Sequence, residues 1–189
     1  MKVRDSGMPA SDSWERFFEP DTILDQLELT ASCRRVAEFG CGYGTFTIPA
    51  ARRVSGEVCA LDIDASMIAV AKKRAEACQL SNVRFSIRDF IAAGTGLPSA
   101  SVDYVMMFNI LHHEEPVELL REAYRILRDG ALLGIIHWNY DAKTPRGPPL
   151  SIRPRPDQCR HWAEEAGFSC GNDKIDLPPY HYGLVMRRG

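Results

Sequence analysis

Acidic, glycine and histidine residues with the spacing of a ligand site are concentrated in the first two thirds of the sequence. The segment Val36–Thr45 reads VAEFGCGYGT, an apolar stretch that ends in Gly40, Gly42 and Gly44. Glycine permits positive φ angles and close approach of the backbone to a ligand. Amides at the start of a helix favour a carboxylate or phosphate. We therefore expect a ligand to contact the main chain at this bend.

Two carboxylates near the bend narrow the type of ligand. Asp62 ends the apolar stretch 57–62, where an acid can accept hydrogen bonds from both ribose hydroxyls. Glu38 lies two residues before Gly40 and offers a negative charge to an ammonium group, which dinucleotides lack. The dinucleotide pattern G-x-G-x-x-G would also need glycine where Thr45 stands. These residues favour an adenosine ligand that carries an amino group over NAD.

The elements that would position these residues alternate between strand and helix, which predicts parallel strands joined by crossover helices. Helices are expected from about Thr45, after Asp64 as N-cap, and from Pro116 to a stop at Gly130. Strands are expected at 34–39, 57–62, 83–87, 102–108 and 131–137.

The two ends of the chain are expected to add helices, a loop and a hairpin. The periodicity predicts a helix over 8–29, capped by Ser11, Asp12 or Ser13, and a short helix that ends at Gly167. Proline-rich residues 140–156 are expected to form one long loop. Two strand-like stretches, 168–176 and 182–187, close the sequence.

The length, net charge and cysteine content of the chain argue against several classes of protein and partner. The chain has 189 residues, enough for one domain, and a net charge of −2 that disfavours nucleic acid as a partner. Six cysteines without a C-x-x-C pair predict reduced thiols and no metal site. No secretory-type segment or run of eighteen apolar residues occurs, so we expect no membrane association and a cytoplasmic location.

Two further motifs follow the glycine bend and Asp62, which makes four motifs in a fixed order. The strand Val102–Phe108 runs into Asn109-Ile110-Leu111-His112-His113, and Leu120–Gly130 reads L-x-E-x-x-R-x-L-x-x-G. With the glycine bend and Asp62, this order over about 34–137 resembles class I S-adenosylmethionine-dependent methyltransferases, of the small type 11/25-like kind. The departure is Asp129-Gly130, where relatives often have Pro-Gly.

The resemblance implies an α/β fold: a doubly wound, seven-stranded, mostly parallel Rossmann-like sheet with an antiparallel C-terminal strand. One domain would comprise an N-terminal helical cap (1–33), a cofactor-binding core (34–137) and a substrate-side loop, helix and hairpin (138–189). S-adenosylmethionine would be the cofactor. The residues expected to bind it are Glu38, Gly40, Cys41, Gly42, Tyr43, Gly44, Asp62, Ile63, Met67, Asp89, Phe90 and Asn109.

Two histidines are candidates for the catalytic base, and further residues are expected to contact the substrate. His112 or His113 would act as base if the acceptor is a hydroxyl, and His112 is favoured. Arg146, Arg153 and Arg155 would receive an anionic acceptor. The expected substrate-binding residues are Trp14, His137, Asn139, Tyr140, Arg153 and Arg155.

The acceptor itself is expected to be a small molecule. The Asn/Asp-Pro-Pro-aromatic motif of adenine or glutamine N-methylation is missing after the fourth strand, and Leu177–Tyr180 is read as a turn instead. A small NAD(P)-dependent oxidoreductase and a non-catalytic S-adenosylmethionine-binding protein remain as alternatives. The sequence leaves open the acceptor, the methylated atom and the oligomeric state.

Overall fold

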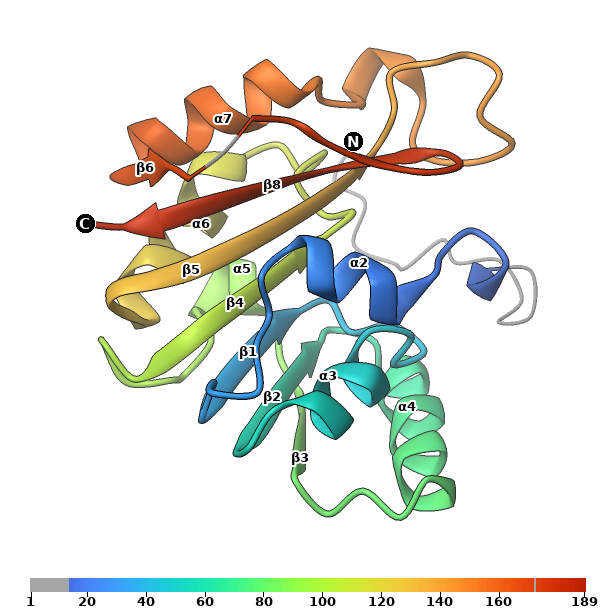
Figure 1. Cartoon of the computed structure of the whole chain (residues 1–189), viewed down its shortest axis with the longest axis vertical. Coiled ribbons are helices and arrows are strands. Elements are labelled where there is room, and N and C mark those ends of the chain that lie inside the picture. The colour runs from blue at the N-terminus through green and yellow to red at the C-terminus, as the bar shows by residue number, and fades with distance from the viewer. Residues whose placement is uncertain (1–13, 172) are drawn as a thin grey trace.

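A computed structural model describes residues 14–171 and 173–189, which form a mixed sheet with helices on both faces (Figure 1). The strands follow the order β3-β2-β1-β4-β5-β8-β6, and β7 also pairs with β8. Their bounds are β1 Arg35–Phe39, β2 Glu57–Asp62, β3 Val83–Ile87, β4 Val102–Phe108, β5 Leu127–Trp138, β6 Phe168–Cys170, β7 Ile175–Leu177 and β8 His181–Arg188. Neighbours among β1 to β5 are parallel and β8 is antiparallel, which confirms the predicted fold class.

The C-terminal edge of the sheet differs in detail from the prediction. The stretch 168–176 was expected to be one strand, but β6 and β7 pair one after the other with the same edge of β8. Two more residues separate Cys170 from Ile175 than separate their partners Met186 and Gly183. A single ladder cannot absorb that excess without a break. The sheet is therefore seven positions wide and has eight strands.

Helices cover the two faces of the sheet in two groups. Side chains of α2 and α3 pack on one face, where α4 also contacts α3, and those of α5, α6 and α7 pack on the other. The bounds are α2 Pro20–Gln26, α3 Thr47–Arg53, α4 Ala65–Ala77, α5 Phe90–Ala93, α6 Pro116–Ile126 and α7 Pro156–Glu165. Parallel crossover connections of this kind bring the carboxyl ends of β1 to β4 to one edge, where ligands bind in open α/β sheets.

Local signals fixed most helix starts. Asp64 caps α4 through a 2.8 Å hydrogen bond from the Ser66 amide, and Pro116 opens α6, both as predicted. Helix α3 begins at Thr47, two residues later than expected, because the glycine bend extends through Phe46. Helix α6 ends at Ile126 rather than Gly130, which lies at positive φ in a bulge of β5.

The proline-containing segments also depart from expectation. The single helix predicted over 8–29 is wrong in the described part, because Pro20 lacks an amide hydrogen and starts a new helix, α2. The proposed cap at Ser11 to Ser13 lies outside the described residues. The loop 140–156 is irregular as expected, except for a 3-10 turn at Leu150–Ile152 and the first residue of α7.

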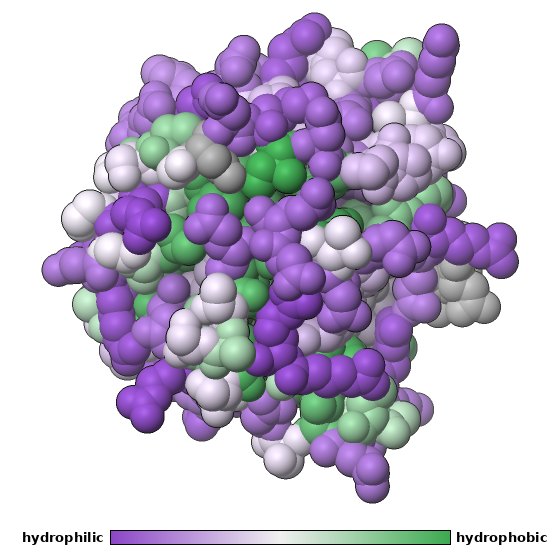
Figure 2. All heavy atoms as spheres, viewed as in Figure 1, coloured by the Kyte–Doolittle hydropathy of each residue, from purple (hydrophilic) through white to green (hydrophobic). Residues whose placement is uncertain are grey.

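Two apolar layers hold the sheet between its helices. Phe39 and Met107 point toward α5 and α6, whereas Val36 and Met106 point toward α2 and α3, in the alternation that strands impose. Figure 2 shows mostly hydrophilic residues on the outside of the face viewed in Figure 1. Within the described residues, no helix has both the length and the apolar character needed to cross a membrane.

Candidate cofactor and acceptor site

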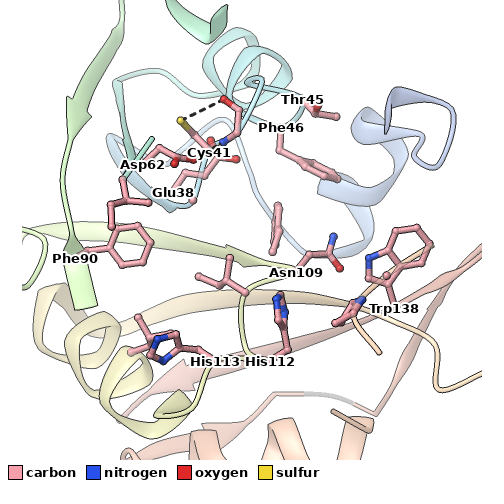
Figure 3. A pocket seen from close by; sticks show the side chains of 18 of the residues that line it. Glu38, Cys41, Thr45, Phe46, Asp62, Phe90, Asn109, His112, His113 and Trp138 are labelled. Carbon is pink, nitrogen blue, oxygen red and sulfur yellow. Dashed lines mark hydrogen bonds between the residues drawn. The ribbon is translucent and has the colours of Figure 1, made fainter. Parts of the chain in front are cut away.

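A cavity of about 370 Å³ opens at the carboxyl ends of β1, β2, β3 and β4 (Figure 3). The turns that follow these strands form its floor and one wall, and Trp14, Trp138 and the loop after β5 form the remainder. The lining residues are Trp14, Glu38, Gly40, Cys41, Gly42, Thr45, Phe46, Asp62, Ile63, Asp89, Phe90, Ile91, Phe108, Asn109, Ile110, His112, His113, Leu119, Trp138, Arg146, Gly147, Pro148, Pro149 and Ile152.

The glycine bend after β1 presents main chain to this cavity. Gly40, Gly42 and Gly44 have φ angles of 75°, 51° and 79°, which L side chains rarely adopt. The Gly40 and Cys41 amides each donate to the Leu61 carbonyl at 2.9 Å, so the bend is fixed to β2. A Cβ atom at Gly40 would lie 3.1 Å from Cγ2 of the cavity residue Ile110. Glycine therefore keeps this wall of the cavity open.

Glu38 is a buried carboxyl group at the cavity floor. It lies on the face of β1 that is covered by α3, and the Thr47 hydroxyl donates to its Oε2 at 2.5 Å. Burial raises the pKa of Glu38 to about 8, against the opposing effect of the Thr47 hydrogen bond, and nearby Asp62 adds to the rise. A buried acid of this kind favours a cation beside it, because the cation restores its charge.

Asp62 is held in one orientation by the two turns that flank it. Its Oδ2 accepts from the Gly42 amide at 2.8 Å and its Oδ1 accepts from the Asp64 amide at 2.9 Å. Burial raises the pKa of Asp62 above its usual value, while these backbone hydrogen bonds oppose the shift. Each oxygen retains a further lone pair for a ligand hydroxyl.

Asp89 and Asn109 supply polar atoms from the turns after β3 and β4. Asp89 caps α5, its Oδ1 accepting from the Ile91 and Ala92 amides at 3.2 and 2.9 Å, which leaves Oδ2 for a ligand donor. Asn109 has a φ of 57°, and its buried Oδ1 has no hydrogen-bond partner in the described structure. A buried acceptor without a partner is costly and suits a ligand that donates.

The two adjacent histidines lie below Asn109 in Figure 3 and differ in their surroundings. Burial lowers the pKa of His112 to about 4, with a smaller contribution from His113. His112 Nδ1 is buried without a partner in the described residues, and its ring meets that of His137 edge-on at 5.5 Å. His113 Nδ1 instead accepts from the Glu115 amide at 3.2 Å. His112 is therefore a neutral imidazole with proton-accepting capacity at pH 7.

Nine of the twelve predicted cofactor residues, both histidines and Trp14 line the cavity, and the others do not. Gly44 packs on α4 instead, where a Cβ atom would lie 3.2 Å from Cβ of Ala71. The predicted residues outside the lining are Tyr43, Gly44, Met67, His137, Asn139, Tyr140, Arg153 and Arg155.

Arg153 does not have the anion-binding environment that the sequence suggested. Its guanidinium is buried and donates to the carbonyls of Asn139, Asp141, Arg146 and Pro148 and to the Thr144 hydroxyl, at 2.6 to 3.3 Å. All three guanidinium nitrogens are thus used within the chain. Arg153 fastens the loop that forms one cavity wall.

Its neighbour Arg155 also departs from the prediction. The Arg155 guanidinium carbon lies 3.8 Å from the centroid of the Tyr140 ring, in a cation–π contact on the surface. Both side chains are exposed and outside the cavity lining.

Replacing Arg153 with leucine is expected to loosen this loop while leaving cofactor affinity unchanged. The substitution leaves buried carbonyls without donors, which costs about 1–3 kcal/mol of unfolding free energy. Trypsin should then cleave after Lys143 and Arg146 faster than in the wild type. Urea denaturation measures the loss of unfolding free energy, and timed proteolysis measures the rate of cleavage. Arg155→Leu, which alters an exposed arginine nearby, should change neither; equal proteolysis of the Arg153→Leu and wild-type proteins would contradict the fastening role.

Arg146, one of the three arginines expected to receive an anion, does line the cavity, but eleven other lining residues were not predicted to contact a ligand. They come chiefly from the loop after β5 and from strand ends: Thr45, Phe46, Ile91, Phe108, Ile110, Leu119, Trp138, Gly147, Pro148, Pro149 and Ile152. The rule that ligands gather at carboxyl ends of parallel strands would have found Phe108 and Trp138. Nothing local in the sequence marks Phe46 or Leu119. No cluster of metal-ligating side chains occurs within residues 14–171 and 173–189.

Comparison with known proteins agrees with this geometry. A family model described as a methyltransferase domain matches residues 36–130. A probable S-adenosylmethionine-dependent methyltransferase of Mycolicibacterium smegmatis is 32% identical over 130 residues, which cover 67% of this chain and 46% of that protein. Aklanonic acid methyltransferase of Streptomyces sp. strain C5 is 32% identical over 118 residues, covering 60% and 53% respectively. The chain thus spans about half the length of the curated relatives it matches.

A solved structure supports the same fold over nearly the whole chain. The crystal structure of an S-adenosylmethionine-dependent methyltransferase from Aquifex aeolicus superposes with a TM-score of 0.82 and 24% identity, covering 93% of this chain and 92% of that one. With the family model spanning half of the sequence, the chain belongs to the class I S-adenosylmethionine-dependent methyltransferase family.

Proposed function

We propose that this protein binds S-adenosylmethionine in the cavity described above and transfers its methyl group to a small-molecule acceptor. One observation carries the proposal: carboxylates from the ends of three consecutive strands, Glu38, Asp62 and Asp89, line one cavity beside the glycine bend. Each of them matches a different polar part of the cofactor.

The residues fit the cofactor group by group. Buried Glu38 and the unpartnered Oδ1 of Asn109 suit the ammonium group of the methionine part. Asp62, oriented by two backbone amides, suits the ribose hydroxyls. The open Oδ2 of Asp89 suits the exocyclic amine of adenine beside Phe90, and the glycine bend admits the backbone contact.

His112 is proposed as the general base for a hydroxyl acceptor. When bound, the cofactor would supply a methyl carbon on a positively charged sulfur, which would keep the electron pair of the broken bond and leave as a neutral thioether. His112 would accept the proton that the acceptor hydroxyl loses as its oxygen takes up the methyl group. The neutral state of His112 at pH 7 keeps a ring nitrogen ready for that proton. Positioning the acceptor beside the methyl carbon supplies most of the remaining rate.

Two observations support a small-molecule acceptor and a cytoplasmic location. One of the relatives is named for a small molecule, aklanonic acid. All six cysteines are free thiols, which supports a reducing compartment such as the cytoplasm.

The dinucleotide alternative fits less well because of charge. A buried Glu38 beneath the bend would face a pyrophosphate with a like charge, or remain an acid without a cation partner. Thermal-shift measurements distinguish the two ligands, since a ligand stabilises the fold in proportion to its affinity. We expect S-adenosylhomocysteine to raise the melting temperature and NADH to leave it unchanged. The opposite order would reject the proposed function.

Catalysis is tested separately, because a non-catalytic binding protein would pass the thermal-shift test. We expect transfer of radiolabelled methyl from S-adenosylmethionine to at least one member of a panel of hydroxylated small molecules. Tight cofactor binding with no transfer to any panel member, at high protein concentration, would favour the non-catalytic alternative.

Cofactor binding is expected to release a proton from Glu38. Because its pKa in the free protein is about 8 and a bound ammonium lowers it, the protonated acid must ionise when the ligand binds below that pH. An acid with a pKa of about 8 is about 1% ionised at pH 6 and about half ionised at pH 8, so the affinity for S-adenosylhomocysteine should rise by about fiftyfold between these two values. Calorimetry in buffers of different ionisation enthalpy measures the released proton.

The matched variant for this prediction is Glu38→Gln. It retains the size and the Thr47 contact but has no proton to release, so its pH dependence reports the ligand alone. The prediction fails if the wild type and Glu38→Gln show the same pH dependence and the same proton release.

A further inference from the structure

The cavity is divided into two sides that differ in chemistry. Figure 3 shows Glu38, Cys41 and Asp62 on one side and Phe46 and Trp138 on the other. All three lining carboxylates belong to the first side, which the proposed function assigns to the cofactor. The second side is therefore the space left for the acceptor.

Aromatic rings dominate the second side and are held rigidly. Phe46 and Phe108 meet edge-on with centroids 4.8 Å apart, and Trp14 and Trp138 meet at 6.2 Å. Phe18 joins the two pairs, lying 5.0 Å from Trp14 and 5.2 Å from Phe46. Phe46, Phe108 and Trp138 are less than a tenth exposed, so their rings cannot turn aside. Such fixed faces and edges suit a flat aromatic ring.

Much of the rest of this side is apolar. Pro148, Pro149 and Ile152 line the cavity from the loop that Arg153 fastens. Trp138 and the Arg153 guanidinium both lie within 3 Å of where a Cβ atom at Gly147 would be, so the loop packs directly on Trp138. The loop is thus fixed against the same aromatic rings.

Charge on this side has one sign. Arg146 is the charged side chain that lines it within the described residues, and it is exposed and forms no ion pair or side-chain hydrogen bond there. His112, which borders this side, is neutral at pH 7. An anionic group therefore finds a partner at the mouth of the cavity, whereas an ammonium group meets a like charge and no carboxylate.

We propose that the acceptor is a flat aromatic hydroxy compound carrying an anionic group, with its ring among Trp14, Phe108 and Trp138 and its anion facing Arg146. This rests on the proposed function, because it assumes that the cofactor occupies the carboxylate-lined side. Its hydroxyl would then lie toward His112, which borders the two sides.

The test measures binding by calorimetry to wild-type protein saturated with S-adenosylhomocysteine. The probes are 6-hydroxy-2-naphthoate, its neutral carboxamide, the corresponding aminomethyl compound as a cation, and 4-hydroxycyclohexanecarboxylate as an acid without an aromatic ring. We expect the naphthoate to bind about fivefold more tightly than either the carboxamide or the cyclohexane acid. The cation should bind most weakly of the four probes. Tightest binding of the cation, equal binding of acid and carboxamide, or binding of no probe would overturn the proposal.

One arginine variant and one lysine variant test whether the preference for an anionic probe depends on Arg146. Arg146→Gln should make the naphthoate and its carboxamide bind equally, whereas Lys143→Gln, an exposed cation in the same loop but outside the cavity lining, should keep the wild-type difference. A preference that survives Arg146→Gln would overturn the assignment of the anion partner. If S-adenosylhomocysteine itself fails to bind at the outset, the proposed function fails; if it binds and the probes show no order, only this inference fails.

Discussion

Replacing Asp62 with alanine is expected to weaken S-adenosylhomocysteine binding by about a hundredfold or more. The carboxylate is proposed to accept hydrogen bonds from both ribose hydroxyls, and a hydrogen bond to a charged group contributes about 1.5–3 kcal/mol. The same substitution removes the acceptor of the Gly42 amide, so the glycine bend loses its brace as well. Isothermal titration calorimetry of the two proteins measures the loss.

Asp64 provides the matched control for this substitution. It lies two residues further along, and its Oδ1 accepts from the Ser66 amide at 2.8 Å as the cap of α4. Its backbone amide still reaches Asp62 when the side chain is alanine. Asp64→Ala should therefore cost about 1 kcal/mol of stability and leave cofactor affinity unchanged. Wild-type affinity in a folded Asp62→Ala protein would contradict the ribose assignment.

Replacing His112 with glutamine is expected to lower kcat by about a hundredfold or more and to leave the affinity for S-adenosylhomocysteine unchanged. A positioned general base contributes about 10²–10⁴ to a rate, and glutamine keeps a polar side chain there but takes up no proton. The rate is measured with an acceptor that the hydroxylated panel identifies. His113→Gln is the control, since its ring nitrogen serves the Glu115 amide, and its kcat should stay within a few-fold of wild type. Equal rates for the two variants would remove His112 as the base.

The pH dependence of kcat offers a second test of His112. Its pKa is lowered to about 4, so the base form predominates at every pH well above that value. At saturating cofactor and acceptor, kcat should therefore not decline between about pH 7 and pH 5 on account of this group. An ordinary histidine, with a pKa of about 6.5, would be mostly protonated at the lower end of this range. A decline in kcat with a midpoint near that value would contradict the buried environment assigned to His112.

The residues whose place depends on local sequence lie together in the cavity, as expected. Glu38 and Gly40 lie at the end of one strand, and Asp62 ends the next strand after a single helix. The end of each strand follows from where its apolar run stops. The backbone geometry of the glycine bend depends on the glycines themselves. For the same reason the five parallel strands and the Asp64 cap were predicted with nearly correct bounds. The division into cap, core and substrate side stays a prediction.

Most of the residues expected to contact the acceptor lie outside the cavity lining, because distant parts of the chain determine which residues come together there. His137 was chosen over Trp138, yet successive residues of a strand point to opposite faces, and the face depends on pairing with β8 some 45 positions later. Trp138 lines the cavity, whereas His137 packs against Tyr182 on the other face. Arg153 shows the same limit: its sequence context is that of a surface loop, and its burial follows from how residues 139–148 fold around it.

A crystal structure of the protein with S-adenosylhomocysteine would locate every part of the ligand at once and so test whether the cofactor occupies the carboxylate-lined side of the cavity. We expect the ribose hydroxyls at Asp62, the adenine between Asp89 and Phe90, and the ammonium group at Glu38 and Asn109. The sulfur should face the aromatic side that Phe108 and Trp138 border. A ligand bound elsewhere, or turned so that its sulfur faces away from His112, would contradict this arrangement.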